Sequence, residues 1–193
     1  SSVIEGRDNA VESGGVMRVL TSRFGEVELS QDDILEFSEG LLGFGQLRRF
    51  IVLDDPNDEI FAWLQSCENP DIAFPILETE LFSLGLSIDI PKGDLEALHL
   101  DKQKDGRMFN IITIPNDPTL MTANMKAPLL INVKKRLARQ CVLQDNNLAI
   151  REPIFSRLQQ RVVQNPETRF KPDAQQIGAV SIKRSDRVPE VEA

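Results

Sequence analysis

The sequence predicts an all-β (mainly β) fold: a compact, β-barrel-like single domain of short antiparallel strands with one or two short helices. Short apolar runs recur along the chain, and clusters of turn-forming residues separate them about every eight to twelve residues. The length of 193 residues suits one domain, and the hydrophobic share of 41% suffices for one core.

The first expected element is a β-hairpin. Val19 and Thr21 alternate with polar neighbours before Phe24-Gly25, and Val27 and Leu29 do so after it. Later apolar runs have the length and the turn-rich flanks of strands. These further strands are expected at residues 34–37, 49–53, 60–64, 72–77, 84–90, 109–114, 121–125, 129–133 and 140–143. One short helix is expected at residues 91–98, with Asp94 or an earlier residue as its cap.

The beginning of the chain differs from the middle. Residues 1–16 are polar and Gly-rich, and the run IEGR at residues 4–7 matches a protease site used in expression tags. We therefore set residues 1–16 aside as a tag or a disordered leader and expect Met17 to be the native start. The predicted barrel domain spans residues 17–155.

The end of the chain also differs. Residues 156–193 form a polar C-terminal extension that we expect to be partly helical or disordered, with a mobile tail beyond Pro166. Residues 157–193 hold seven Lys or Arg against five Asp or Glu, a net charge of +2. Since the whole chain has a net charge of -8, residues 1–156 carry -10. An acidic body suits basic partners and does not suit the backbone of a nucleic acid.

Residues for catalysis or metal binding are scarce. The chain has one histidine, His99, and two cysteines, Cys67 and Cys141, which lie in apolar runs rather than at metal-ligand spacing. We expect the cysteines to be buried free thiols in a reducing cytosol and expect no metal or cofactor. A Cys–His enzyme is kept as an alternative until coordinates place His99.

A second alternative is a small RNA-binding barrel, supported by the basic cluster of Lys134, Lys135, Arg136 and Arg139. No aromatic residue interleaves with this cluster, and the chain contains no Tyr, whereas base stacking needs aromatic faces. We therefore interpret the cluster as a solvated turn and expect no direct nucleic-acid binding. No apolar stretch approaches the ~20 residues of a membrane span, so we expect no membrane partner.

Four ordered motifs carry a resemblance to a known family. The run TANMKAPLLIN at residues 122–132, followed by QCVL at residues 140–143, resembles the C-terminal signature of the FliW flagellar assembly factors. The loop LLGF at residues 41–44, the strand FAWLQS at residues 61–66 and the strand IITIP at residues 111–115 resemble the corresponding FliW segments in the same order. The resemblance covers most of the chain, from about Met17 to about Ile154.

The resemblance implies a non-enzymatic protein with one β-barrel-like domain and no cofactor. It implies binding to the RNA-binding translational regulator CsrA, which relieves CsrA repression of flagellin translation, and binding to flagellin itself. We expect such a protein to work in the cytoplasm and to be a monomer when alone. Two departures from the family pattern stand out: Leu42 replaces the usual proline of the loop, and Leu84-Gly85 stand where an aromatic-acidic pair is usual.

The candidate partner-binding residues come from two segments. Glu78 and Glu80 would point the same way on a strand and form either an acidic patch for a basic partner or a solvated face. Asn124 and Asn132 lie in the family signature, and we interpret them either as hydrogen bonding to loop backbone or as partner contacts. The full candidate set is Glu78, Glu80, Leu84, Asn124, Lys126 and Asn132.

Overall fold

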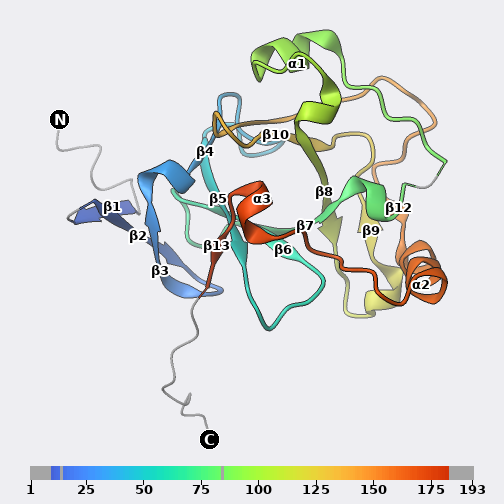
Figure 1. Ribbon diagram of the computed structural model, residues 1–193. Helices are drawn as coiled ribbons and strands as arrows, with labels where there is room; N and C mark the ends of the chain where they lie inside the picture. The colour runs from blue at the N-terminus through green and yellow to red at the C-terminus, as the bar shows by residue number, and fades with distance from the viewer. Residues whose placement is uncertain (1–9, 14, 84, 183–193) are drawn as a thin grey trace, which may run out of the picture.

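The computed structural model of the protein describes residues 10–13, 15–83 and 85–182, and in this part of the chain seven strands close into a barrel (Figure 1). The neighbour order is β10-β11-β4-β5-β6-β7-β8, and pairing between β8 and β10 closes the ring. The predicted barrel fold is therefore confirmed. The barrel strands are β4 (Leu35–Phe37), β5 (Arg49–Asp54), β6 (Ala62–Ser66), β7 (Ala73–Glu78), β8 (Arg107–Thr113), β10 (Leu129–Asn132) and β11 (Leu137–Gln140).

One barrel pair departs from the expected antiparallel arrangement. β4 and β11 run parallel, with Leu137 opposite Glu36 and Ala138 opposite Phe37. The other barrel pairs are antiparallel. Because a ring of seven strands has an odd number, a sheet closed on itself cannot be antiparallel at every pair, so one parallel pair is geometrically required.

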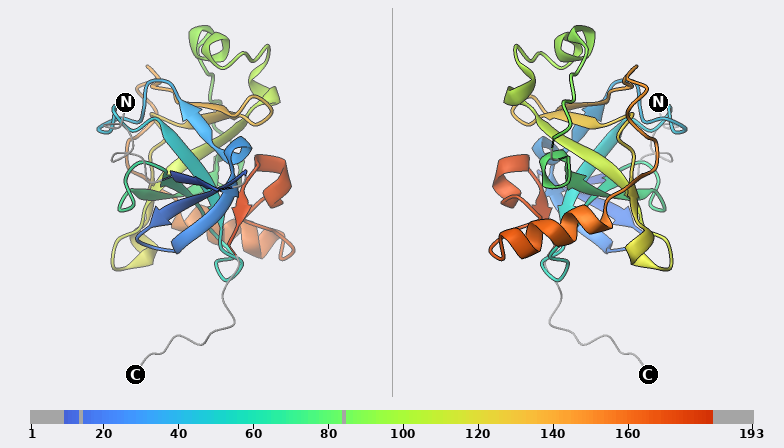
Figure 2. Two further views of the ribbon diagram at one scale, coloured as in Figure 1. Left: turned by 90° about the vertical axis from the view of Figure 1, so that its left-hand side faces the viewer. Right: turned by 90° about the vertical axis from the view of Figure 1, so that its right-hand side faces the viewer.

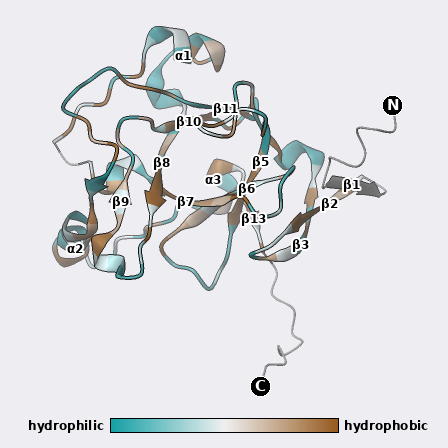
Figure 3. Ribbon diagram, turned by 180° about the vertical axis from the view of Figure 1, so that it is seen from behind, coloured by the Kyte–Doolittle hydropathy of each residue, from teal (hydrophilic) through white to brown (hydrophobic). Residues whose placement is uncertain are grey.

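The barrel interior is a single apolar cluster to which each of the seven strands contributes a side chain. Val52 of β5 stands opposite Leu64 of β6, and both belong to this cluster, whereas their neighbours Leu53 and Trp63 face outward into a second cluster. This alternation explains why the strands show hydrophobic residues on both faces. In Figure 3 the hydrophobic colour gathers on the strands. The buried interior members are Leu35, Phe37, Leu41, Leu47, Phe50, Val52, Ala62, Leu64, Ile76, Phe109, Leu129, Ile131, Ala138 and Ile177.

An N-terminal hairpin covers one outer side of the barrel (Figure 1). β2 (Val16–Thr21) and β3 (Gly25–Ser30) pair in register, and Val19 and Val27 face the outer cluster, as the sequence predicts. A further strand, β1 (Ala10–Ser13), lies within residues 1–16, for which we expected a tag or a disordered leader, and it pairs with β2. Backbone hydrogen bonding to an edge strand needs no apolar alternation, so composition gave no sign of it. Residues 1–9 lie outside the described residues.

The segment between β7 and β8 differs most from expectation. A strand is expected at residues 84–90, but the described residues 85–90 form none. The side chain of Gln103 donates to the carbonyl of Ile88 and accepts from the amide of Ile90, so an amide side chain takes the place of a neighbouring strand. The predicted helix is present as α1 (Lys92–Ala97); its N-cap is Pro91, and no side chain caps it. Short 3-10 turns lie at η2 (Gln31–Asp33), η3 (Thr79–Leu81), η4 (Gln103–Asp105) and η5 (Pro118–Leu120).

Two short strands precede the C-terminal extension, which folds back onto the barrel. β9 (Thr122–Ala123) pairs with β8 and with β12 (Glu152–Pro153), and α2 (Phe155–Gln164) follows along the outside of the barrel (Figure 2). The chain then returns through α3 (Ala174–Ile177) to β13 (Val180–Ser181), which pairs in parallel with β5. The expected mobile tail beyond Pro166 therefore differs from the structure over residues 167–182. Among the described residues, no helix combines the length and apolar character of a membrane span.

Candidate partner-binding surface

Glu78 and Glu80 line one cavity, although they do not lie on one strand. β7 ends at Glu78, and the chain turns through η3, which carries Thr79 and Glu80. The cavity holds about 500 Å³ and lies against the first residues of β8. Other lining residues are Ser83, Leu86, Ile88, Gln103, Lys104, Gly106, Arg107 and Met108. The two carboxylates thus lie near each other as predicted, but a turn after β7, rather than one continuous strand, places them there.

The two carboxylates differ in how much charge they present to solvent. Glu78 is half-buried, and its carboxylate lies 2.9 Å from the guanidinium of Arg107. Burial raises the pKa of Glu78; the charge of Arg107 opposes that rise, and the nearby charge of Glu80 adds to it. Glu80 is exposed. Because Arg107 offsets Glu78, Glu80 is the more exposed carboxylate of this pair, although the guanidinium of Arg161 donates to its backbone carbonyl at 3.3 Å.

A buried hydrogen-bond network connects this cavity to the family signature. The hydroxyl of Thr79 donates to Oδ1 of Asn110 at 2.5 Å, and Nδ2 of Asn110 donates to the carbonyl of Asn124 at 2.7 Å. The side-chain oxygen of Asn124 accepts from the amides of Lys126 and Ala127. Asn124 therefore shapes the bend before β10, and its side chain is engaged with backbone rather than aimed at solvent.

Asn132 has a similar structural role at the end of β10. Its Nδ2 donates to the carbonyl of Leu98 at 2.8 Å, and its Oδ1 accepts from the amide of Lys135 at 3.2 Å. The side chain is buried and ties the segment after α1 to the β10–β11 turn. The interpretation that both asparagines bond to loop backbone is confirmed. Lys126 is half-buried beside Asn124, and Leu84 lies outside the described residues.

The basic cluster is divided by the fold. Arg139 pairs with Asp94 at 2.5 Å and with Glu39 at 3.5 Å, which anchors α1 to the barrel. Arg136 is half-buried, and its guanidinium donates to the backbone carbonyls of Asp33 and Gly178. Lys134 and Lys135 are left as exposed charges. Two of the four cations thus serve internal contacts, which weakens the case for a nucleic-acid surface here.

The residues of the enzymatic alternative have unsuitable surroundings. Cys67 and Cys141 are buried, and burial raises the pKa of Cys141 to about 12, whereas a nucleophilic cysteine needs a lowered pKa. His99 is exposed and has a left-handed backbone with φ of 57°. Within residues 10–13, 15–83 and 85–182, no group of three or more His, Cys, Asp or Glu has metal-binding geometry.

Sequence reasoning missed Arg107, which sets the electrostatics of the cavity. Its partner Glu78 is 29 positions earlier in the chain, and the pairing of β7 with β8 brings them together by placing Glu78 opposite Phe109. Only the register of the β7–β8 pair could have revealed that Arg107 lies beside Glu78. The structure brings together Glu78, Glu80 and, through Thr79 and Asn110, Asn124.

The fold and these contacts define the class of protein: a small closed β-barrel with a cavity lined by two carboxylates, Glu78 and Glu80, and two cations, Lys104 and Arg107. A sequence model of the FliW protein family matches residues 18–154, and the chain belongs to this family. It is 66% identical to the flagellar assembly factor FliW of Bdellovibrio bacteriovorus over 155 residues, which cover 80% of this chain and 89% of that protein. It is 33% identical to the FliW of Thermoanaerobacter pseudethanolicus, covering 74% of this chain and 95% of that protein.

A solved structure agrees with these sequence matches. The crystal structure of a flagellar assembly factor FliW superposes with a TM-score of 0.67 at 30% sequence identity. The superposition covers 72% of this chain and 96% of the other. The chain is thus a flagellar assembly factor of the FliW family, and the matched family region ends at Ile154, before α2.

Proposed function

We propose that this protein binds the translational regulator CsrA and also flagellin, and that it relieves CsrA repression of flagellin translation while flagellin is being assembled. It acts in the cytoplasm as a monomer, by binding alone, without a cofactor, without catalysis and without direct contact to nucleic acid. Membership of the FliW family is the observation that carries this proposal.

Charge supports a basic partner. Residues 1–156 carry a net charge of -10, and an RNA-binding regulator must present a basic surface to its own ligand. Such complementarity speeds association and favours the correct partner. The exposed Glu80, at the cavity next to the Glu78–Arg107 ion pair, is the residue we assign to the contact with CsrA.

The first experiment measures complex formation. The purified chain is mixed at micromolar concentration with CsrA, or with flagellin, from the same organism and analysed by gel filtration and calorimetry. We expect a complex with each protein. Failure to form a complex with either would overturn the proposal.

The second experiment tests the surface. We expect Glu80→Lys to weaken CsrA binding about tenfold, which corresponds to ~1.4 kcal/mol, and to leave the melting temperature unchanged because the residue is exposed. Glu26→Lys, an exposed reversal of the same charge on the distant hairpin strand β3, is the matched control. Equal affinities for the two variants would show that CsrA docks elsewhere.

A further inference from the structure

Residues 167–182, here called the C-terminal strap, cross one end of the barrel. This is the end where β5 finishes at Asp54 and β11 starts at Leu137 (Figures 1 and 2). The strap ends in β13, where Val180 stands opposite Leu53 and Ser181 opposite Asp54. The amide of Ile182 donates to the carbonyl of Asp54 at 2.8 Å. The strap lies beyond the matched family region, so the closed barrel is complete without it.

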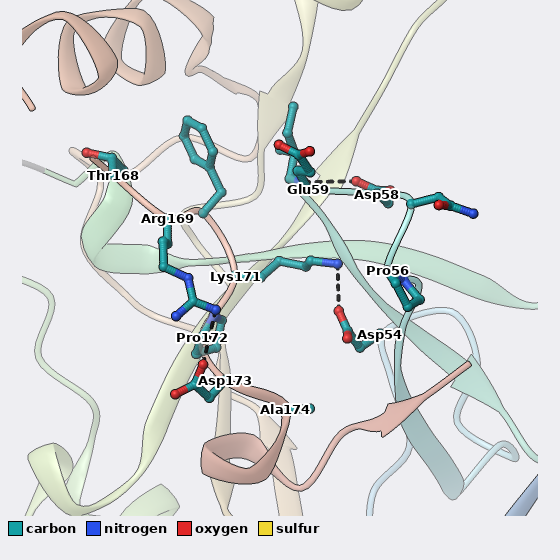
Figure 4. Close-up of a pocket in the computed structure, with 13 residues that line it drawn as sticks. Asp54, Pro56, Asp58, Glu59, Thr168, Arg169, Lys171, Pro172, Asp173 and Ala174 are labelled. Carbon is teal, nitrogen blue, oxygen red and sulfur yellow. Dashed lines mark hydrogen bonds and ion pairs between the residues drawn. The ribbon is translucent and has the colours of Figure 1, made fainter. Parts of the chain in front are cut away.

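The strap is held by an ion pair at its first part. Nζ of Lys171 lies 2.6 Å from the carboxylate of Asp54 and donates to the carbonyl of Asp55 at 2.9 Å. Figure 4 shows the lysine side chain reaching from the strap to Asp54 on β5. Both side chains are partly shielded from solvent, so the contact is screened less than an open surface pair.

The second part of the strap is held by one buried apolar side chain and by hydrogen bonds from Arg136 to its backbone. Ile177 is 2% exposed and joins the apolar interior of the barrel. The guanidinium of Arg136 donates to the carbonyls of Ile177 and Gly178, at 3.5 Å and 3.1 Å. The barrel therefore offers an exposed strand edge, a carboxylate, an apolar pocket and a donor for backbone carbonyls. These are the elements by which a sheet edge recognises an extended peptide.

The strap is fastened more lightly than the barrel strands. Ile177 is its only fully buried side chain, Phe170, Ala179, Val180 and Ile182 pack only partly buried against the core, and β13 spans two residues. A cavity of about 1080 Å³ separates residues 168–174 from the β5–β6 turn at residues 56–60 (Figure 4). Segments with few buried apolar contacts open at much lower free energy than the core. The strap is therefore suited to release.

We propose that the strap is an internal occupant of a peptide-binding site, and that a segment of a partner protein with the same turn-and-strand conformation displaces it. The partner segment carries a basic residue for Asp54 and, six positions later across a helical turn like α3, an aliphatic residue for the pocket of Ile177. It then continues as a strand along β5. This inference goes beyond the proposed function and does not depend on CsrA or flagellin, because the site is defined by the chemistry of its occupant.

The test opens the strap in the full chain and adds a labelled peptide of residues 167–182. Gly178→Val is the opening variant: Gly178 has a φ of +63°, and a Cβ there would displace the guanidinium of Arg136, which removes its bonds to the carbonyls of Ile177 and Gly178. Gly43→Val is the matched control, with a φ of +82° and nothing within 4 Å of its Cβ. Fluorescence anisotropy should show at least tenfold tighter peptide binding to Gly178→Val than to the wild type or the control.

Peptide variants test the chemistry of the site. Replacing the peptide lysine by Glu, or its isoleucine by Asp, should remove binding, while a peptide that keeps only these two residues at the same spacing should compete. Lys171→Glu is a second opening variant should Gly178→Val fail to fold. Equal peptide binding by the wild type and a folded opening variant, no binding by either, or failure of the minimal peptide to compete would overturn the proposal.

Discussion

Replacement of Asn132 by alanine tests whether the family signature serves folding or partner contact. The change removes the 2.8 Å bond to the carbonyl of Leu98 and the 3.2 Å bond from the amide of Lys135. Leu98 is buried, so its carbonyl loses a partner in a shielded place, whereas Lys135 is exposed and its amide can bond to water. A hydrogen bond contributes about 0.5–1.5 kcal/mol, and an unpaired buried carbonyl costs about 1–3 kcal/mol. We expect Asn132→Ala to lower the free energy of unfolding by about 2–3 kcal/mol.

The assay is urea unfolding followed by the fluorescence of Trp63, the single tryptophan of the chain. A loss of that size should lower the melting temperature by roughly 5–10 °C. Asn147→Ala, at an exposed loop asparagine, is the control and should leave the stability within about 0.5 kcal/mol of the wild type. Weakened binding to CsrA or flagellin at unchanged stability would refute the structural role assigned to Asn132.

Three further outcomes follow from the contacts described. Glu78 has a raised pKa in the folded state, so the stability of Glu78→Gln relative to the wild type should increase as the pH rises from about 4 through that pKa. Urea titrations between pH 4 and 8 measure this difference in unfolding free energy, and a decrease with rising pH would contradict the prediction. Cys67 and Cys141 are buried, so Ellman's reagent at pH 8 should leave both unmodified in the folded chain and modify both in urea; rapid labelling of the folded chain would oppose this. Asp94→Asn should destabilise the fold by ~1–2 kcal/mol through loss of the Arg139 ion pair, and a thermal shift that is the same in 1 M salt would argue against an electrostatic cause.

The strands with clear alternation could be predicted from the sequence. β2 and β3 bury every second residue against the barrel, so their hairpin was visible in the positions of Val19 and Val27. The segment at residues 84–90 shows the same alternation, but the described residues 85–90 form no strand. Of its alternating apolar residues only Ile90 is buried, Ile88 is half-buried and Leu86 is exposed, and Gln103 provides the backbone hydrogen bonds. Apolar alternation alone does not show what the backbone bonds to.

The boundary of β11 shows a related limit. A strand is expected at residues 140–143, whereas β11 ends at Gln140. The amides of Cys141 and Leu143 still donate to the carbonyls of Pro128 and Lys126, so the chain continues alongside its neighbour beyond the regular strand. The apolar residues marked this contact correctly, while the start of β11 at Leu137 lies in a polar stretch that carries no such signal.

The candidate site was predictable only in part. The closeness of Glu78 and Glu80 follows from their spacing, but their difference in charge depends on Arg107, which only the strand register reveals. The strap was hidden for another reason: Ile177 is its only fully buried side chain, and its few apolar residues stand in a polar segment without a periodic pattern. Its ion pair joins residues more than a hundred positions apart, Asp54 and Lys171.

The parallel pairing of β4 with β11 also fixes when the barrel can close during synthesis. Glu36 and Leu137 meet across this pair, so closure must wait until about a hundred further residues have been made and have left the ribosome. A contact of such separation carries a large loop-closure entropy and slows folding relative to local hairpins. We therefore expect the β2–β3 hairpin and β5–β7 to form first and the ring to close late. The nascent chain accordingly passes through an open sheet, with the edges of β4 and β8 unpaired, before the protein reaches its final form.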